Sequence, residues 1–327
     1  MDKITLGTQG LRVSKIGLGG MGFSVAYGAS DPQKGVDVIR EAYHLGVNFF
    51  DTAEVYGDNE KIVGKAVKPF RDDIVLATKF GFDMSAKPIT SKFNSRPDNI
   101  RKVAENSLLQ LGTDYIDVFY QHIPDPDVPI EEVAGVVGDL IKEGKVKYFG
   151  LSNSGSDSIR RANKITPVSV LQSEYSIFER ELEDRHIIET LQELNIGLVP
   201  YAPLGRGFLT DAVKPASEYP EDDMRRHDER WNEENFKYNL NAVNQLKAFA
   251  ENKHISVAQL ALAWLMNQDL NVVPIPGTRS IKRLQENIGS TQVKLSRQDL
   301  DDILAILPNG SAGSRYPAGV LENFTRE

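Results

Sequence analysis

The chain contains no cysteine among its 327 residues, which excludes disulfide bonds and thiolate chemistry. It also lacks a long apolar run, because its most apolar helical stretch, Val257–Met266, is far too short to span a bilayer. Basic residues are outnumbered, with 38 Lys and Arg against 46 Asp and Glu, for a net charge of −8. Nucleic acids and anionic membranes bind a net basic face, so we expect neither as a partner.

The remaining composition is that of an ordinary soluble protein, with 40% hydrophobic and 26% charged residues. The first residues, Met1–Leu6, have no apolar core of the signal-peptide type, so we expect a cytoplasmic protein. An anionic ligand would have to be bound by a local basic cluster. The sequence makes no prediction about the oligomeric state.

Strand-like and helix-like segments alternate along the chain after a predicted N-terminal β-hairpin formed by Ile4–Leu6 and Leu11–Ser14. The predicted strands are Ile16–Gly20, Val47–Phe50, Ile74–Ala77, Tyr115–Tyr120, Val146–Leu151, Val170–Gln172, Gly197–Tyr201 and Asn271–Ile275. The predicted helices are Pro32–Leu45, Glu60–Val67, Pro97–Leu111, Pro129–Glu143, Asp157–Ile165, Glu183–Leu194, Phe236–Met266 and Ile281–Gly289.

Eight strand-then-helix repeats without a long linker favour a closed (β/α)8 TIM barrel over an open doubly wound sheet. We therefore expect one domain over residues 1–327. Ser296–Leu307 predicts an additional C-terminal helix, and the tail Pro308–Glu327 is expected to pack across one face without regular structure. The G-x-G-x-x-G match at Gly17–Gly22 does not predict a Rossmann fold, because the next helix signal comes only at Asp31-Pro32.

Polar residues follow several of the predicted strands, and four of them form a chemically coherent set. Asp51 and Tyr56 follow the second strand, and Lys79 and His122 follow the third and fourth, so parallel strands would bring all four to one edge. We expect Lys79 to lower the pKa of Tyr56, and Asp51 to keep Lys79 charged. His122 could orient a carbonyl oxygen. None of the four is a hydride source, so a cofactor must supply reducing equivalents.

Each of these residues also has a simpler interpretation when taken alone. Asp51 and Lys79 could be an ion pair at the barrel rim, Tyr56 a packed surface aromatic, and His122 a structural histidine. Their joint occurrence at successive strand ends makes these interpretations much weaker for the set. The other histidines lie in scattered polar or helical contexts, so no metal site is expected.

With these residues and several further segments, the chain resembles the aldo-keto reductase family over nearly its whole length. It is most similar to the bacterial and plant members that carry a Tyr-Gln-His sequence, here Tyr120–His122. The supporting segments are Gly150–Asn153 (GLSN), Gln172–Tyr175 (QSEY), Pro200–Gly207 (PYAPLGRG) and Pro274–Arg279 (PIPGTR). The resemblance implies that Tyr56 is the general acid in carbonyl reduction, that Lys79 and Asp51 tune it, and that His122 positions the substrate oxygen.

The resemblance also implies a nicotinamide cofactor, and for it a set of binding residues. Ser152, Asn153 and Gln172 would bind the carboxamide, and Tyr201 would stack on the ring. The pyrophosphate would be wrapped by Leu204, Gly205, Arg206 and Gly207, and Ala202 and Pro203 just before them would also contact the cofactor. Gly20, Met21 and Asp51 would also contact the cofactor.

A predicted binding site for a phosphate monoester favours NADPH over NADH. Arg279 and Arg283 lie one helical turn apart, and Thr278 and a helix N-terminus add donors beside them. Guanidinium groups suit a phosphate monoester, although solvated helix charges remain the alternative. By resemblance, Gly277 belongs to the same segment, and Glu286 and Asn287 would bind the adenine.

We expect the substrate to be a small carbonyl compound, and the sequence does not say which one. The predicted pocket is an apolar mouth with aromatic walls, lined by Met21, Phe23, Tyr27, Phe82, Phe93, Ile123 and Trp231. The charged stretch at 210–235 is a candidate segment for closing over the cofactor.

The leading prediction is an NADPH-dependent reductase of aldehydes and ketones. One alternative is a redox-sensing regulatory subunit that resembles the channel-associated β-subunits of this superfamily and has little turnover. Another is a phosphate-binding lyase barrel that uses Lys79 as an imine-forming amine.

Overall fold

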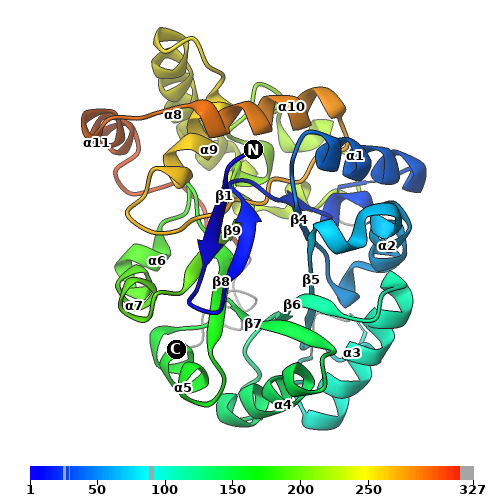
Figure 1. Cartoon of the computed structure of the whole chain (residues 1–327). Coiled ribbons are helices and arrows are strands. Elements are labelled where there is room, and N and C mark those ends of the chain that lie inside the picture. The colour runs from blue at the N-terminus through cyan, green and yellow to red at the C-terminus, as the bar shows by residue number, and fades with distance from the viewer. Residues whose placement is uncertain (25–26, 29, 88–91, 317–327) are drawn as a thin grey trace.

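Seven parallel strands form one sheet in the order β3 to β9, with helices following them around the outside (Figure 1). The computed structural model describes residues 1–24, 27–28, 30–87 and 92–316. The strands are β3 Leu18–Gly19, β4 Phe49–Asp51, β5 Val75–Phe80, β6 Ile116–Gln121, β7 Val146–Ser152, β8 Val168–Glu174 and β9 Gly197–Tyr201. The helices that lie between these strands in the chain are α1 Pro32–His44, α2 Asn59–Val67, α3 Pro97–Leu111, α4 Ile130–Lys142, α5 Ser156–Ile165, α6 Glu181–Asp184 and α7 Ile187–Leu194. The remaining helices are α8 Glu233–Asn252, α9 Val257–Met266, α10 Ile281–Gly289 and α11 Arg297–Ile306.

The predicted eighth strand, Asn271–Ile275, is not a regular strand in this structure. The segment lies between β9 and β3, with one bridge to Leu198 and a hydrogen bond of 2.9 Å from the amide of Gly17 to the carbonyl of Pro274. Pro274 has no N–H to donate, so a continuous ladder cannot form there. The segment nevertheless spans the gap between β9 and β3, which confirms the predicted TIM barrel.

The N-terminal hairpin, β1 Lys3–Leu6 and β2 Leu11–Ser14, lies across one end of the barrel (Figure 1). Leu6 and Leu11 are fully buried against the barrel interior. At Gly197, the first residue of β9, a Cβ would lie 2.5 Å from a methyl carbon of Leu6. The hairpin therefore covers the amino ends of the strands and leaves the carboxyl ends for other segments.

Two predicted helices are each divided into two. The stretch Phe236–Met266 breaks between α8 and α9, where His254 has a φ of 57° and Ser256 begins α9 with a capping box. The stretch Glu183–Leu194 breaks between α6 and α7, where His186 has a φ of 54°. A left-handed residue cannot continue an α-helix, so each break follows from the backbone conformation.

Two irregular segments cover the carboxyl end of the barrel. One runs from β9 to α8 and contains the short 3-10 turns Ala216–Glu218, Met224–His227 and Glu229–Trp231. The other is the described part of the C-terminal tail, residues 308–316, whose Ser311 amide donates to the carbonyl of Phe178 at 2.9 Å. This part of the tail packs without regular structure, as the composition predicted.

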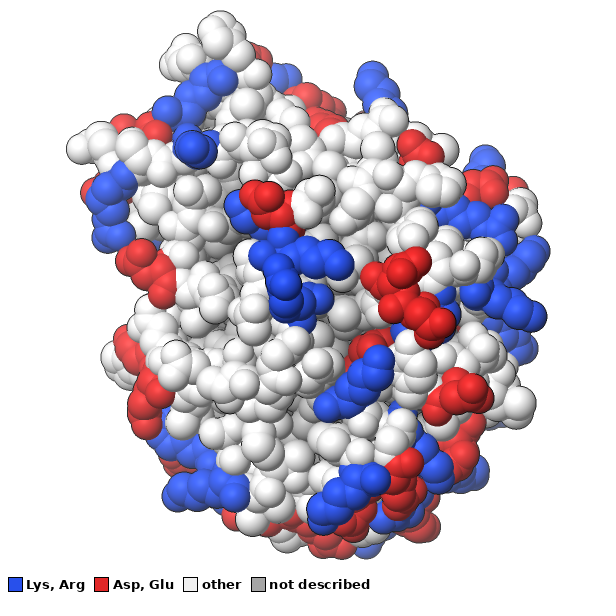
Figure 2. Space-filling view, viewed as in Figure 1, with Lys and Arg blue, Asp and Glu red and all other residues white. Residues whose placement is uncertain are grey.

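The face that carries the hairpin shows basic and acidic side chains around its rim and a further basic group near its centre (Figure 2). Many surface charges are paired, as in the contacts of Arg161 with Glu131 at 2.7 Å and of Lys15 with Asp2 at 3.3 Å. Within the described part of the chain, no helix combines the length and apolarity that crossing a bilayer requires.

Candidate active site

The four predicted catalytic residues meet at the carboxyl edge of three neighbouring strands. Asp51 is the last residue of β4, Lys79 lies near the end of β5, and His122 follows β6 directly. The strands pair in the order β4, β5, β6 and run parallel, so their ends face the same side. Tyr56 lies in the 3-10 turn Glu54–Tyr56 that follows β4, which returns it toward the same edge.

Lys79 and Asp51 form a buried ion pair at the centre of this group. The Lys79 Nζ donates to Asp51 Oδ1 at 2.5 Å and to the Thr52 carbonyl at 2.7 Å, and both charged side chains are at most 4% exposed. Burial raises the pKa of Asp51 and lowers the pKa of Lys79, and the contact between the two opposes both shifts. Gln172 Nε2 also donates to Asp51 Oδ2 at 2.8 Å. Each charge is thus the countercharge of the other, and their contact favours the ionised pair against the effect of burial.

Tyr56 lies against both the ammonium and the histidine. The Lys79 Nζ is 5.2 Å from the centroid of the Tyr56 ring, and the Tyr56 and His122 rings meet edge-on with centroids 5.8 Å apart. The pKa of Tyr56 is raised well above its usual value, first by burial and then by the negative charge of Asp51. The expected lowering by Lys79 is therefore not found, because Asp51 offsets the ammonium and the phenol is desolvated.

His122 is a neutral imidazole in this environment. Burial, together with the charge of Lys79, lowers its pKa well below the usual value. Phe82 packs edge-on against it, with ring centroids 5.1 Å apart. A neutral imidazole donates one N–H, so His122 can direct a hydrogen bond at a substrate oxygen but supplies no positive charge.

The residues predicted to bind a carboxamide form one hydrogen-bonded group beside the tetrad. Asn153 Nδ2 donates to the His122 carbonyl at 3.2 Å and to Ser152 Oγ at 3.0 Å. The Tyr201 hydroxyl donates to Asn153 Oδ1 at 3.0 Å. Asn153 itself has a φ of 55°, a conformation that asparagine tolerates better than most residues. The structure thus brings Ser152, Asn153 and Tyr201 together, and Gln172 joins them through its carbonyl, which accepts from the Asn153 amide at 3.0 Å.

Tyr316 from the C-terminal tail also reaches this group, and the sequence did not predict it. Its hydroxyl lies 3.2 Å from the hydroxyl of Tyr201, and the guanidinium carbon of Arg206 is 5.0 Å from the centroid of its ring. Tyr316 is also one of the groups that raise the pKa of Tyr56 electrostatically, so the two phenols lie close together. A tail residue brought in by tertiary packing leaves no local sequence signal.

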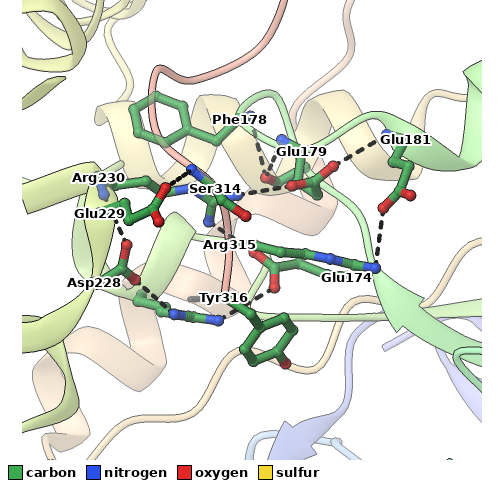
Figure 3. Close-up of polar contacts among 12 residues, drawn as sticks. Glu174, Phe178, Glu179, Glu181, Asp228, Glu229, Arg230, Ser314, Arg315 and Tyr316 are labelled. Carbon is green, nitrogen blue, oxygen red and sulfur yellow. Dashed lines mark hydrogen bonds and ion pairs between the residues drawn. The ribbon is translucent and has the colours of Figure 1, made fainter. Parts of the chain in front are cut away.

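A buried ion cluster holds the tail over the ends of β8 and β9 (Figure 3). Arg230 donates to Glu174 and to Glu179, each at 2.8 Å. Arg315, beside Tyr316 in the tail, pairs with Glu181 at 3.0 Å. We call Glu174, Glu179, Glu181, Arg206, Asp228, Arg230 and Arg315 the buried ion cluster. It ties the barrel, the 210–232 segment and the tail into one unit.

The loop Ala202–Gly207, whose last four residues are predicted to wrap a pyrophosphate, has an unusual backbone. Positive φ angles occur at Ala202 (47°), Gly205 (57°), Arg206 (56°) and Gly207 (96°). The Arg206 side chain turns inward, with its Nη1 2.6 Å from Asp228 Oδ2 and its Nη2 3.6 Å from Glu174 Oε2. Its charge is therefore used within the buried ion cluster, and only its backbone remains for a ligand at the loop. Pro203 and Leu204 complete this loop.

The predicted phosphate segment leads into α10 as expected. Ser280 caps the helix by accepting from the Arg283 amide at 3.4 Å, and the Arg283 side chain is exposed. Arg279 instead fastens the loop after β3, because its guanidinium donates to the carbonyls of Gly22 at 2.5 Å and Gly28 at 3.0 Å. Both cations lie near the N-terminus of α10, where a phosphate is favoured.

The other predicted cofactor residues line the same side of the barrel. A Cβ on Gly277 would lie 3.1 Å from the Gly19 carbonyl, so the backbones at the two strand exits lie close together. Gly20 accepts a hydrogen bond of 2.7 Å from Asn59, and Met21 is half-buried. Along α10, Glu286 is half-buried, Asn287 is buried, and Thr278 lies just before the helix cap.

The predicted pocket residues divide into two groups. Tyr27, Phe82 and Phe93 lie near the tetrad, with Phe82 contacting both His122 and the Phe93 ring. Phe23, Ile123 and Trp231 are at most 4% exposed, as Phe82 is, and Phe23 and Trp231 belong to the hydrophobic clusters of the barrel. Trp231 packs on Phe208 with ring centroids 4.8 Å apart.

Sequence comparison identifies the class of protein that this barrel and tetrad define. The sequence model of the Aldo/keto reductase family matches residues 15–308, and the chain belongs to that family. It is similar to "Probable aldo-keto reductase 1" of Glycine max, with 44% identity over 332 residues, 99% of this chain and 94% of that protein. "Aldo-keto reductase yakc [NADP(+)]" of Schizosaccharomyces pombe is 40% identical over 314 residues, 94% of this chain and 92% of that protein.

Solved structures agree with this assignment. The glycerol dehydrogenase of Gluconobacter oxydans superposes with a TM-score of 0.84 at 30% identity, over 94% of this chain and 97% of that one. A thermostable aldo-keto reductase in complex with the inhibitor epalrestat gives a TM-score of 0.73 at 26% identity, over 94% of this chain and all of the other. The chain is an oxidoreductase of the aldo-keto reductase type.

Proposed function

We propose that the protein reduces aldehydes and ketones to alcohols with NADPH as the hydride donor and Tyr56 as the general acid. The observation that carries this proposal is the buried Lys79–Asp51 pair, whose ammonium lies 5.2 Å from the Tyr56 ring. His122 meets the same ring edge-on, so a carbonyl oxygen beside the phenol would also be within reach of an imidazole. Two donors at one oxygen are the arrangement that carbonyl reduction needs.

The raised pKa of Tyr56 suits this direction of the reaction. A phenol with a raised pKa stays protonated at neutral pH and is therefore always ready to donate. The oxygen that it protonates develops alkoxide character, and an alkoxide is a much stronger base than a phenolate. Proton transfer from Tyr56 to the developing alkoxide is thus favourable even though the pKa of the phenol is raised.

His122 would orient the substrate oxygen, and Asp51 would hold Lys79 in place. Because the pKa of His122 is lowered, its imidazole donates a hydrogen bond without competing for the proton of Tyr56. Asp51 keeps Lys79 charged and fixes it through the 2.5 Å contact. Burial of Lys79 and Asp51 keeps water from their ion pair, which strengthens that electrostatic interaction.

The residues around the tetrad fit a nicotinamide dinucleotide. NADPH would supply the hydride that no side chain of this chain can provide. Ser152, Asn153 and Gln172 would hold its carboxamide and Tyr201 would stack on its ring. The turn at Leu204–Gly207 would lie along the diphosphate. The exposed Arg283 and the N-terminus of α10 fit a phosphate monoester, and one relative is named for NADP(+).

The pocket residues favour apolar carbonyl substrates. Phe82 lies against His122, and Tyr27 and Tyr316 lie close to Tyr56. Such aromatic walls select by shape, and one methylene of fit is worth only about 1–3 kcal/mol. A range of small aldehydes and ketones is therefore expected to be reduced.

Turnover fits these observations better than a purely regulatory role. A binding subunit has no chemical need for a phenol beside a buried ammonium, whereas carbonyl reduction needs a proton donor at that position. An imine-forming role for Lys79 is opposed by its burial, because its side chain is 0% exposed and its Nζ already donates to Asp51 and to the Thr52 carbonyl. An imine-forming amine must be neutral to attack.

The proposal is tested by following the loss of NADPH absorbance with a panel of aldehydes and ketones, repeated with NADH. We expect reduction of several carbonyls and a higher kcat/KM with NADPH than with NADH. An Arg283→Ala variant should lose much of this preference. If no carbonyl in the panel is reduced with either cofactor, the proposed function is wrong.

A further inference from the structure

Asn59 is a fully buried polar residue at the start of α2, shortly after the turn that carries Tyr56. It is 0% exposed, and a buried carboxamide costs free energy unless its polar atoms are hydrogen-bonded. Its Oδ1 accepts from the Thr52 hydroxyl at 2.7 Å. Its Nδ2 donates to the Gly20 carbonyl at 2.7 Å and to Ser24 Oγ at 2.9 Å. Both N–H groups and the carbonyl oxygen of the side chain are therefore used.

The contact with Gly20 fixes which way the carboxamide of Asn59 faces. A carbonyl oxygen only accepts, so the Asn59 nitrogen must face it, and a rotated carboxamide would place two oxygens against each other. The fit is close, because a Cβ on Gly20 would lie 2.7 Å from Asn59 Oδ1 and 2.8 Å from the Asp51 carbonyl. The Gly20 amide also donates to that Asp51 carbonyl at 2.8 Å. Asn59 thus has one orientation, next to the end of β4.

The other two contacts of Asn59 lead to the proton donor and to its ammonium neighbour. Ser24 Oγ, which accepts from Asn59, donates in turn to the Tyr56 carbonyl at 2.7 Å. Thr52, whose hydroxyl donates to Asn59, uses its carbonyl to accept from Lys79 Nζ at 2.7 Å. One side chain therefore connects the backbone that carries Tyr56 with the backbone that holds Lys79.

The turn Glu54–Tyr56 needs such a contact from outside. Within it, the Tyr56 amide donates to the Ala53 carbonyl at 3.1 Å, and Gly57 follows directly with a φ of 64°. A three-residue 3-10 turn has few hydrogen bonds of its own, so its neighbours decide where its side chains lie. Ser24 is such a neighbour, and Asn59 orients Ser24. A catalytic group displaced by about 1 Å can lose about 10²-fold in rate.

We propose that Asn59 is a positioning residue of the tetrad, which holds the Tyr56 phenol and the Lys79 ammonium at the separation that proton transfer needs. It acts through Ser24 on Tyr56 and through Thr52 on Lys79. This inference rests on the proposed function, because it takes Tyr56 as the proton donor. Loss of the Asn59 carboxamide slows proton transfer from the phenol and spares any reaction that does not use the phenol.

The experiment measures single-turnover carbonyl reduction by the full-length protein at saturating NADPH and substrate, so that weaker binding does not lower the rate. Asn59→Ala is compared with Asn48→Ala as a matched control. Asn48 is also a buried asparagine, 7% exposed, and its Oδ1 accepts from the Ser14 amide at 2.6 Å, beneath the hairpin at the opposite end of the barrel. Thermal unfolding is recorded for every variant.

Asn59→Ala should lower the single-turnover rate by about 10²-fold, the effect of a misplaced catalytic group. Asn48→Ala should stay within about threefold of the wild-type rate, because its contacts lie far from the tetrad. Both variants should unfold at a lower temperature, since each leaves a buried group without its partner. Ser24→Ala removes only the link to Tyr56 and should lose about tenfold, the value of one hydrogen bond.

A double variant separates positioning from a merely structural role. Tyr56→Phe has no phenol to position, so adding Asn59→Ala to it should slow the residual reaction by no more than about threefold. A general loosening of the barrel would instead multiply the two losses. The fall in unfolding temperature caused by Asn59→Ala should be the same in both backgrounds.

Three results would overturn the inference while leaving the proposed function intact. They are a wild-type rate in Asn59→Ala, an equal loss of rate in Asn48→Ala, and multiplied losses in the double variant. If Asn59→Ala does not fold, Ser24→Ala decides in its place, and a wild-type rate in that variant overturns the inference. If the wild-type protein reduces no carbonyl, the proposed function fails first and this inference fails with it.

Discussion

The buried Lys79–Asp51 pair makes a quantitative prediction about stability. Replacing Lys79 with Met keeps the length of the side chain and removes its charge. Asp51, which is 3% exposed, would then keep only the hydrogen bond from Gln172 at 2.8 Å. Removing one partner of a buried pair usually costs about 3–5 kcal/mol, because the other charge is left uncompensated. We expect Lys79→Met to lower the free energy of unfolding by this amount at pH 8.

The loss should depend on pH in a definite direction. Without the ammonium, burial raises the folded-state pKa of Asp51 further above its unfolded value of about 3.9. A raised folded-state pKa means that the folded protein binds the proton more tightly, so stability falls as pH rises through the folded pKa. Lys79→Met should therefore be destabilised less at pH 5 than at pH 8, relative to the wild type at the same pH.

A double variant separates the charge from the packing. Asp51→Asn combined with Lys79→Met removes both charges at nearly constant volume, and such replacements are often neutral or stabilising. The double variant should be more stable than Lys79→Met, although it should have no reductase activity. Urea unfolding at both pH values, analysed by linear extrapolation, measures these differences. The reasoning is refuted if Lys79→Met matches the wild type at both pH values, or if the double variant is the least stable protein.

Three further outcomes are expected. Because the pKa of Tyr56 is raised, carbonyl reduction should be flat with pH until above about 10, while alcohol oxidation, which needs the phenolate, should rise with pH; parallel profiles for the two directions would contradict this. Arg230→Met should lower the free energy of unfolding by about 3–5 kcal/mol, since it leaves Glu174 without its 2.8 Å partner; urea unfolding would show no loss if the cluster were unimportant. Gly313→Ala should detach the tail, because φ is 90° there and a Cβ would lie 2.7 Å from the backbone carbon of Glu229; unchanged proteolysis after residue 308 would argue against this.

Much of the barrel was predictable because each strand and helix carries a local signal. Apolar runs, proline at helix starts and glycine at helix ends fix the order of the elements. The break before α9 could also have been predicted, since Ser256 and Gln259 have the spacing of a capping box. The irregular eighth segment, Asn271–Ile275, could have been expected from its proline, which cannot donate to a ladder.

The candidate site was predictable where strand ends determine it and not where loops do. Asp51 and Lys79 follow apolar runs, so the parallel sheet brings them together. Trp231 and Phe23 were predicted at the pocket, but an aromatic residue in a loop gives no sign of whether it faces the mouth or the core. Tyr316 arrives through the tail, and composition does not reveal the contacts that place it.

Arginine was the hardest residue type to place from sequence. Arg206 lies in a segment predicted to wrap phosphate, yet its side chain belongs to the buried ion cluster. Arg225 had no predicted role and lies over Gly207. A long side chain reaches several ångströms in any direction, so its partners depend on tertiary packing. The sequence position of an arginine therefore predicts where its backbone lies better than it predicts which groups its guanidinium contacts.

The proton donor is tested most directly by single-turnover reduction with the Tyr56→Phe variant and bound NADPH. The substitution removes one hydroxyl and keeps the ring that contacts Lys79 and His122. We expect the rate of NADPH oxidation to fall by about 10²–10⁴-fold, the usual contribution of a general acid, while the dissociation constant for NADPH stays unchanged. A Phe variant that reduces carbonyls at close to the wild-type rate would show that the proton comes from another group.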